Sequence, residues 1–385
     1  MRLFDKTGVI HVHTRYSDGA GTVRRVAQAA VRAGLDFVIV TDHDTLAGLE
    51  NGDEGWYDRR GRIVQGARPA GRAGRTLVIF GYEISPDDGN HFLALGLDEV
   101  VPKEEGPPAY VREVARRGGL GFVAHPVYPP PRRYPLKTFP WTARDVRGFA
   151  GVEIWTYSVD WLTDVTTLPR LAAAVAAPDR FVDGPFPEAL AWWDALCREA
   201  WARGRRVPGI GGADAHGILY SDRRMFRAVR THVLLDRDWT GDAAADKRAV
   251  LEALREGRAY VAYDGLQDAT GFRFFAEAGD VEVPMGGVVR LHDGSRPGSR
   301  ERLRAGAEHR PAGRGHGPPG RVVLRARAPV PCVLTLRTPA GTVARAESGR
   351  LDCAVREPGV YRVEAHLPGR RGTRPWVFAN PIYVR

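Results

Sequence analysis

Residues 8–19 have the sequence GVIHVHTRYSDG, which joins a short apolar run to a cluster of polar side chains. The run GVIHV is rich in Val and Ile, as strands buried on both faces are. His11 and His13 stand at its end, and Asp18 follows in a Ser-Asp-Gly turn. Because residues i and i+2 of a strand point to the same side, we expect both imidazoles to reach one point beyond the strand.

The same pattern, an apolar run that leads into histidine or a carboxylate, recurs along the first 216 residues. DFVIV (36–40) leads into TDHD, TLVIF (76–80) into GYE, LGFV (120–123) into AHP, and PGIGG (208–212) into ADAH. The polar residues that the pattern marks are His43, Glu83, His91, His125, Asp214 and His216. Neutral imidazole and carboxylate are the ligands that borderline divalent metals prefer, so the pattern predicts a metal site.

Each motif also has a purely structural interpretation. His91 could be a hydrogen-bonded histidine at a strand edge, and an isolated HxH pair is weak evidence for a metal. Asp42 and Asp44 could cap the helix that begins at TLAGL, so we leave them out of the ligand set. Glu153, inside GVEIW, is interpreted as a partner that orients a ligand histidine. The structural alternatives would have to hold independently at six strand ends, so together the motifs favour a metal centre.

Segments with helical spacing separate the strand-like runs, at 22–34, 108–117, 188–203 and 246–256. Alternating strands and helices predict an α/β barrel or a doubly wound sheet. Ligand-type residues at the ends of many strands favour the barrel, because all strand ends meet there at one mouth. We expect two insertions, 50–75 and 127–148, to form loops over this mouth. The aromatic residues expected in or near such loops are Trp56, Tyr57, Tyr128, Tyr134, Trp141, Trp155 and Trp161.

The pattern changes near residue 266, where short alternating strands begin and turn residues separate them. This predicts an all-β, sandwich-like domain over 266–385 behind a barrel over 1–265. Within the second domain, residues 293–320 contain few apolar side chains, so we expect a disordered loop there.

The composition narrows the classes of partner. The net charge is +10, but nearly all of it is arginine without a basic stripe or interleaved aromatics, so we expect no nucleic-acid partner. No stretch approaches the roughly 18 apolar residues of a membrane span, and no apolar signal segment precedes the first strand. Three cysteines without CxxC spacing fit a reducing compartment, so we expect a cytoplasmic protein. No feature predicts an oligomeric state.

The motifs HVHTRYSDG, TDHD, GYE, AHP and GGADAH resemble, in order and spacing, those of the PHP (polymerase and histidinol phosphatase) superfamily. The resemblance covers about residues 1–235, and the β-rich tail ending in PWVFANPIYV looks most like the carbaryl-hydrolase-like (CehA/McbA) branch. It implies a distorted (β/α)7 barrel, similar to a TIM barrel, and two or three divalent ions, either Zn, Mn or Fe. The implied ligand sets are His11, His13, Glu83 and Asp214 for the first ion, Glu83, His91 and His125 for the second, and Asp18, His43 and His216 for the third. Some members have histidine in place of Asp18, which leaves the number of ions open.

The resemblance implies a metal-dependent hydrolase, and we expect a phosphoesterase that acts on a small, anionic phosphomonoester through a metal-bridging hydroxide. Asp214 or His216 would transfer the proton at the leaving group. Arg15, or Arg223 and Arg224, would receive the anionic group, unless these arginines only solvate the surface. One alternative is a carbamate, ester or amide hydrolase with the same metal site. The other is a non-catalytic, metal-stabilised binding module.

Overall fold

The computed structural model describes residues 2–64, 74–130, 137–163, 165, 167–177, 180–217, 222–291, 321–369 and 372–385. Within this part of the chain, no helix is both long enough and apolar enough to cross a membrane. The segment 293–320, for which the sequence predicts a disordered loop, lies outside the described residues.

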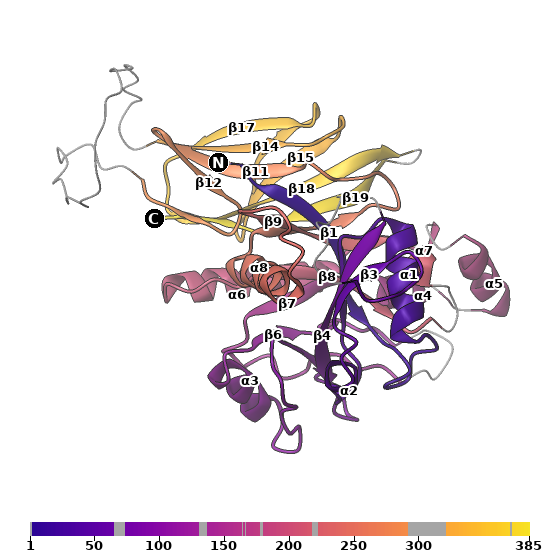
Figure 1. The fold of residues 1–385 in the computed structure, drawn as a ribbon. Coiled ribbons are helices and arrows are strands. Elements are labelled where there is room, and N and C mark those ends of the chain that lie inside the picture. Colours follow the sequence, from indigo (N-terminus) through magenta and orange to yellow (C-terminus); the bar gives the residue numbers. More distant parts are fainter. Residues whose placement is uncertain are drawn as a thin grey trace.

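Seven of the described strands form a closed barrel (Figure 1). They are β1 (Phe4–Val12), β2 (Phe37–Val40), β4 (Arg75–Ile84), β5 (Phe92–Leu95), β6 (Leu120–Val123), β7 (Gly151–Thr156) and β8 (Gly209–Ala215). They pair in this order, and β8 returns to pair with β1. The barrel predicted from the sequence is therefore confirmed.

The barrel departs from a regular (β/α) arrangement at β5. This strand runs antiparallel to both β4 and β6, whereas the other barrel pairs are parallel. The start of β5, rather than its end, therefore lies at the same mouth as the ends of the parallel strands. This reversal brings His91, which precedes β5, to the residues that follow the other strands.

Helices cover the outside of the barrel only in part. They are α1 (Val23–Ala33), α2 (Ala47–Glu50), α3 (Pro107–Arg116), α4 (Tyr157–Thr163), α5 (Leu168–Ala176), α6 (Pro187–Ala202), α7 (Asp222–Met225) and α8 (Ala243–Glu256). The predicted ends of α1 are correct: the Thr22 side chain accepts from Arg25 N, and Gly34 ends the helix at φ 78°.

The strand register explains how the interior is filled. Ile10 and Ile39 are register partners on β1 and β2, and they belong to one buried cluster that also contains Ile79. Val9 and Val38 point the opposite way and join the cluster that packs beneath the helices. Alternation along the strands thus separates an inner core from an outer one.

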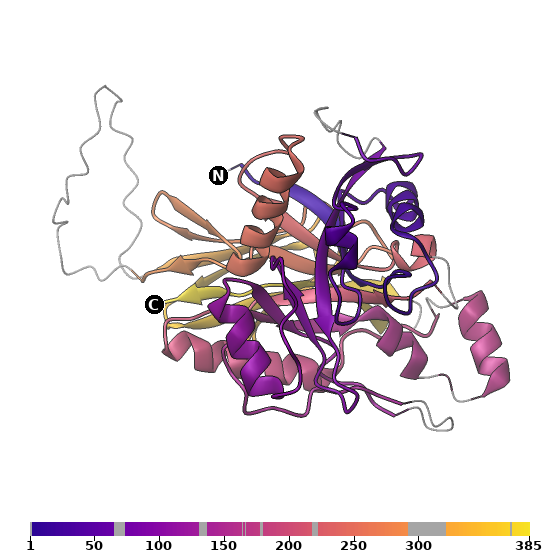
Figure 2. The same cartoon turned by 60° about the horizontal axis from the view of Figure 1, so that its bottom comes forward.

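Strands after the barrel form two facing sheets. The first continues the barrel sheet through β9 (Val229–Leu235), β10 (Ala259–Tyr263), β19 (Gly372–Ala379), β18 (Gly359–Gly369), β20 (Ile382–Val384) and β13 (Val288–Val289), with β15 (Val333–Thr338) and β16 (Gly341–Ala346) branching from β18. The second contains β12 (Val281–Pro284), β11 (Arg273–Ala278), β14 (Val322–Arg327) and β17 (Arg350–Val355). Both contribute to one apolar cluster and gather on one side of the barrel (Figure 1 and Figure 2). The predicted sandwich is therefore present.

Barrel and sandwich share a sheet, because β10 pairs with β9 on one edge and with β19 on the other. The Asn380 side chain adds polar contacts: it accepts from Gly209 N at 2.6 Å and donates to Gly209 O at 3.0 Å and Ala259 O at 2.8 Å. Arg362 of β18 forms a bidentate pair with Asp194 of α6. The division of the chain at 265/266 stays a prediction.

A buried polar network lies at the junction of β1, β9 and β10. His232 Nδ1 lies 3.1 Å from Asp5 Oδ1, and its Nε2 lies 3.1 Å from Asp264 Oδ2. Tyr260 donates to Asp5 at 2.7 Å and stacks its ring on that of His232. Burial alone would lower the pKa of His232, but the charges of Asp264 and Asp5 outweigh it and raise this pKa to about 9. No motif in the sequence predicted this cluster.

The first insertion differs from the prediction. Part of 50–75 forms β3 (Gly55–Asp58), which pairs antiparallel with β4. Trp56 and Tyr57 are buried in β3, and Trp141, Trp155 and Trp161 are also buried in the core. The expectation of a loop was therefore wrong for Trp56 and Tyr57, because burial of large apolar rings outweighed their loop-like sequence context. Trp141 does lie in the second insertion, and Trp155 and Trp161 lie in β7 and in α4, which follows it. Tyr134 lies outside the described residues.

Candidate metal centre

The predicted ligands meet at one mouth of the barrel. They are His11 in β1, His13 and Asp18 beyond its end, His43 beyond β2, Glu83 in β4, His91 before β5, His125 beyond β6, Asp214 in β8 and His216 beyond it. Their side chains form three groups whose ligand atoms lie within 4.8 Å of one another.

The first group contains His11, His13 and Glu83, with Asp214 beside it. His11 Nε2 lies 3.4 Å from Glu83 Oε1 and 3.5 Å from Asp214 Oδ1. His13 Nε2 lies 3.6 Å from Glu83 Oε2 and 3.4 Å from Asp214 Oδ1. The four residues of the implied first ligand set therefore face one another.

The second group contains Glu83, His91 and His125. His91 Nδ1 lies 3.1 Å and His125 Nε2 lies 3.3 Å from Glu83 Oε1. Glu83 thus borders the first and second groups with the same carboxylate, which is the position of a ligand that bridges two ions.

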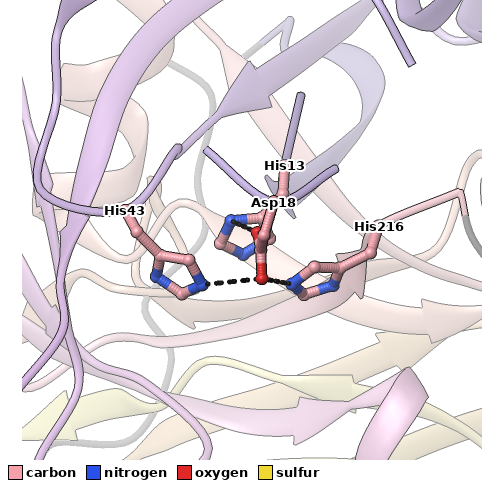
Figure 3. Close-up of side chains that lie close together, drawn as sticks. All are labelled: His13, Asp18, His43 and His216. Carbon is pink, nitrogen blue, oxygen red and sulfur yellow. Dashed lines mark ion pairs between the residues drawn. The ribbon is translucent and has the colours of Figure 1, made fainter. Parts of the chain in front are cut away.

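The third group contains His13, Asp18, His43 and His216 (Figure 3). Asp18 Oδ2 lies 3.5 Å from His43 Nε2 and 3.3 Å from His216 Nε2. The implied third set did not include His13, whose Nδ1 lies 3.8 Å from Asp18 Oδ1. His13 therefore borders the first group through Nε2 and the third through Nδ1.

The distances within the groups suit shared metal ions. Two ligands bound at about 2.0–2.2 Å to one ion stand roughly 3.0–3.5 Å apart at tetrahedral or octahedral angles. Among the described residues, His11 Nε2, both ring nitrogens of His13 and Glu83 Oε2 are buried without a hydrogen-bond partner. Leaving buried polar atoms unpaired costs about 1–3 kcal/mol each, and metal ions would supply the missing partners. The donor set therefore fits divalent ions.

Backbone strain is concentrated at the same residues. In the described part of the chain, the non-glycine residues with positive φ are His11, Asp44, Asn90, His125 and Asp214. Three of them are predicted ligands, and Asp44 and Asn90 each adjoin one. Left-handed conformations cost about 1–3 kcal/mol outside glycine and collect at functional sites.

Strain at His11 also explains how the HxH pair reaches the site. Strict alternation would place His11 on the same side as Val9, beneath the helices. The register between β1 and β8 instead shifts between Ile10 and Val12, and His11 takes φ 68°. The pair converges as predicted, but through a bulge rather than through a regular strand face.

Polar partners hold the ligand rings in place. The Glu153 carboxylate lies 3.0 Å from His11 Nδ1 and accepts from His125 N at 2.7 Å and Thr156 Oγ1 at 2.7 Å. Its role as a partner of ligand histidines therefore matches the expectation from the sequence. Ser158 donates to Asp214 Oδ2 at 2.8 Å, a contact the sequence did not suggest. Such partners fix the orientation of metal ligands.

Asp42 and Asp44 do not cap a helix. Asp42 accepts from Thr14 N at 2.6 Å, Thr14 Oγ1 at 2.7 Å and Ser17 Oγ at 2.7 Å, and so shapes the turn that carries Asp18. Asp44 accepts from Ser85 N and from Lys103. The capping interpretation was wrong, because α2 begins at Ala47 and its N-cap residue, Leu46, makes no side-chain cap.

The protonation states of Glu83, Asp214 and His13 suit metal binding. Burial would raise the pKa of Glu83, but the nearby His11 and His91 hold it well below its usual range. Burial likewise opposes ionisation of Asp214, and the charges of His11 and His216 hold its pKa low. Burial lowers the pKa of His13 to about 4. Ionised carboxylates and a neutral imidazole are the forms that bind metals. The nearby carboxylates outweigh burial and raise the pKa of four other site histidines, whose protons a bound metal would displace: His11, His43, His125 and His216.

A cavity of about 450 Å³ opens onto the groups. Its lining includes ligands of all three groups together with Ser85, Lys103, Tyr128, Lys137 and Phe139. The second insertion, 127–148, therefore reaches the mouth as predicted, through Tyr128, Lys137 and Phe139. Neither lysine was predicted, although two of the four lysines in the chain lie here and lysine is rare in this arginine-rich sequence.

The arginines expected to receive an anion lie elsewhere. Arg15 is exposed, its Nε donates to Ala20 O, and it lines a separate cavity with Thr22 and Arg24. Arg224 is exposed and donates to Ala176 O. The structure does not describe the side chain of Arg223. Neither Arg15 nor Arg224 therefore lines the cavity at the candidate metal centre.

Residues 10–103 match the model of the PHP domain family. The chain is 26% identical over 131 residues to the uncharacterized protein MJ1587 of Methanocaldococcus jannaschii, a match that covers 31% of this chain and 67% of that protein. It is 32% identical over 98 residues to phosphoribosyl 1,2-cyclic phosphate 1,2-diphosphodiesterase of Eggerthella lenta, covering 24% of this chain and 32% of that enzyme. This chain thus spans about a third of the enzyme's length.

Among solved structures, a two-domain protein from Bacteroides vulgatus that contains a predicted PHP-like metal-dependent phosphoesterase aligns with 98% of this chain and 95% of its own. The sequence identity is 14% and the TM-score is 0.41. The narrower carbaryl-hydrolase-like branch stays a prediction.

Proposed function

Residues 10–103 match the PHP domain family, and from this premise we propose that the chain is a metal-dependent phosphoesterase acting on a small phosphomonoester. The coarser conclusion, a metal-dependent hydrolase, follows from the family and from the three His, Asp and Glu groups. One observation carries the proposal: neighbouring groups share a ligand residue, Glu83 between the first two and His13 between the first and third. Adjacent divalent ions suit hydrolysis of phosphoesters.

The three groups are proposed to hold two or three divalent ions, of Zn, Mn or Fe. When bound, such ions supply Lewis acidity toward a phosphoryl oxygen and lower the pKa of a coordinated water. The chain's contribution is to fix the ligands: Glu83 presents its carboxylate to two groups, and Glu153 and Ser158 hold His11 and Asp214.

Exposure sets the direction from which a substrate reaches the ions. The side chains of His11, His13 and Glu83 are at most 1% exposed, whereas that of Asp18 is 55% exposed. His216 and Asp214 are partly open, at 25% and 14%. We therefore assign proton transfer at the leaving group to Asp214 or His216, because both face the cavity.

The cavity lining favours this reaction over the two alternatives. A carbamate or amide hydrolase would need an apolar, aromatic pocket, but Lys103 and Lys137 line this cavity beside Tyr128 and Phe139. A non-catalytic binding module would need neither a full ligand set nor strained ligand backbones such as that of Asp214.

Phosphate release from a panel of phosphomonoesters tests the proposal, with manganese-loaded protein and an Asp214→Ala variant. We expect turnover in the wild type and a loss of roughly a hundredfold or more in the variant, because a ligand and a proton-transfer group are removed together. Asp98→Ala, which removes an exposed carboxylate outside the site, is the matched control.

Metal content is measured on each protein. Full turnover in Asp214→Ala would contradict the assignment of this residue. No release from wild type that retains its ions would contradict the phosphoesterase and favour carbamate or amide cleavage.

A further inference from the structure

The two lysines of the cavity have different surroundings. Lys103 Nζ lies 2.5 Å from Asp44 Oδ2 and donates to Ser85 O at 2.9 Å, so its charge is already paired. Lys137 makes no ion pair or hydrogen bond with the described residues, and its Nζ lies 5.2 Å above the ring of Phe139. Of the two, only Lys137 presents an unpaired ammonium group to the cavity.

Phe139 ties Lys137 to the second group of ligands. Its ring stacks on that of His91, with centroids 4.7 Å apart, and its carbonyl oxygen lies 2.9 Å from His125 Nδ1. These contacts fix the backbone two residues beyond Lys137. The cation–π contact with the same ring holds the ammonium group beside the ligands, at an energy of about 0.5–1 kcal/mol for an exposed pair.

Charge in the cavity points to an anionic ligand for this lysine. Glu83, Asp214 and Asp18 would be neutralised by metal ions, and Asp44 is neutralised by Lys103. Asp87 is the remaining carboxylate among the described residues of the lining. Among those described residues, Lys137 therefore remains as a cation available to a bound anion. An ammonium group binds phosphate as a point charge with charge-assisted hydrogen bonds.

We propose that Lys137 is a specificity-determining residue, which binds phosphoryl oxygens of the substrate and favours the dianion of a phosphomonoester over the monoanion of a phosphodiester. The inference rests on the proposed phosphoesterase function. It assigns to Lys137 the anion-binding role that the sequence suggested for Arg15, which lines another cavity.

Two substrates that release the same leaving group, p-nitrophenol, test the role of Lys137. They are the monoester p-nitrophenyl phosphate and the diester bis(p-nitrophenyl) phosphate. We expect Lys137→Met to lower the ratio of kcat/KM for the monoester to that for the diester by roughly tenfold, the effect of losing a charge-assisted hydrogen bond. Lys137→Arg should retain most of the ratio. Arg112→Met removes one positive charge from the exposed face of α3 and is the matched control.

An unchanged ratio in Lys137→Met, or equal losses on both substrates, would overturn the inference and leave the phosphoesterase function intact. Calorimetry with inorganic phosphate on metal-loaded protein gives a readout without turnover. A Kd about tenfold weaker in Lys137→Met than in wild type supports the inference, and an equal Kd overturns it. Failure of the wild type to hydrolyse either ester, with metals bound, overturns the proposed function instead.

Discussion

Glu153 connects two ligands that are 114 positions apart in the chain, since its carboxylate contacts the ring of His11 and the backbone of His125. It is fully buried. Its place depends on Gly212: a Cβ added there would lie 1.6 Å from Glu153 Oε1 and 3.0 Å from His11 Cβ. A glycine in β8 therefore makes room for the carboxylate that orients the first group.

Replacing Glu153 by glutamine should weaken metal binding by roughly tenfold to a hundredfold, the usual effect of losing a partner that orients a ligand. The amide keeps the size of the side chain but loses the charge beside His11. Titration calorimetry with Mn²⁺ or Zn²⁺ measures the change. Glu113→Gln, on the solvent side of α3, is the control. Equal affinities in wild type and Glu153→Gln would show that Glu153 only fills space.

At the scale of residues, the sequence could predict which side chains meet at the mouth of the barrel, because most of them follow an apolar run that ends there. It could not predict Lys103 or Lys137, because both lie on connecting segments whose paths depend on tertiary contacts. The same limit explains Arg15: it follows His13 closely in the chain, yet the turn shaped by Asp42 directs it to another cavity.

At the scale of elements, β1, β9 and β10 are joined by the buried His232 and its two carboxylates. Arg230 contacts Asp264, and Arg273 contacts Asp5, so each acid also faces an arginine. Burial would raise the pKa of Asp5. The charge of His232 and the hydrogen bonds that Asp5 accepts outweigh burial and lower this pKa to about 2. The network therefore stabilises the sheet only while His232 carries its proton and Asp5 is ionised.

The network predicts that stability falls in alkaline solution. The folded pKa of His232, about 9, exceeds its ordinary value of 6.5. The folded state thus binds the proton more tightly, and the stabilisation is complete below pH 6.5 and lost as the pH rises through 9. The free energy of unfolding should fall by up to about 3 kcal/mol over this range. Urea denaturation at both pH values, with metal removed by chelator, measures it.

His232→Gln is the comparison for that experiment, because the other histidines then contribute equally to both proteins. The variant should lose most of the decrease between the two pH values. A decrease as large in His232→Gln as in wild type would assign the pH dependence to other groups.

Helices and strands could be predicted where the hydrophobic periodicity and the capping residues indicate the same bounds, as for α1 between Thr22 and Gly34. Two features were not predicted. The direction of β5 had a signal in the sequence, because residues 85–91 are too few for the crossover that a parallel strand needs. β3 lies in a segment rich in glycine and arginine, and it forms because Trp56 and Tyr57 are buried beside β4.

At the scale of the whole molecule, Asn380 of the C-terminal strands contacts the backbone of Gly209 at the start of β8. Asn380→Ala should lower the free energy of unfolding by about 1–3 kcal/mol, because it leaves buried backbone groups unpaired. Since barrel and sandwich share a sheet, we also expect a single unfolding transition. Thermal denaturation followed by circular dichroism measures both, with the exposed Asn51→Ala as control. Two separate transitions would contradict the expectation that the barrel and the sandwich unfold as one unit.

Closure of the barrel through β1 has a consequence for biosynthesis. β1 pairs with β8 and β9, which end at Ala215 and Leu235, so the first strand made must wait until more than half of the 385 residues have left the ribosome. Until then the edges of β1, and His11 within it, have no partners from those strands. Such long-range pairing is slow and exposes strand edges to aggregation. We therefore expect the nascent chain to be most prone to aggregation before these strands emerge, and the candidate metal centre to be completed late in synthesis.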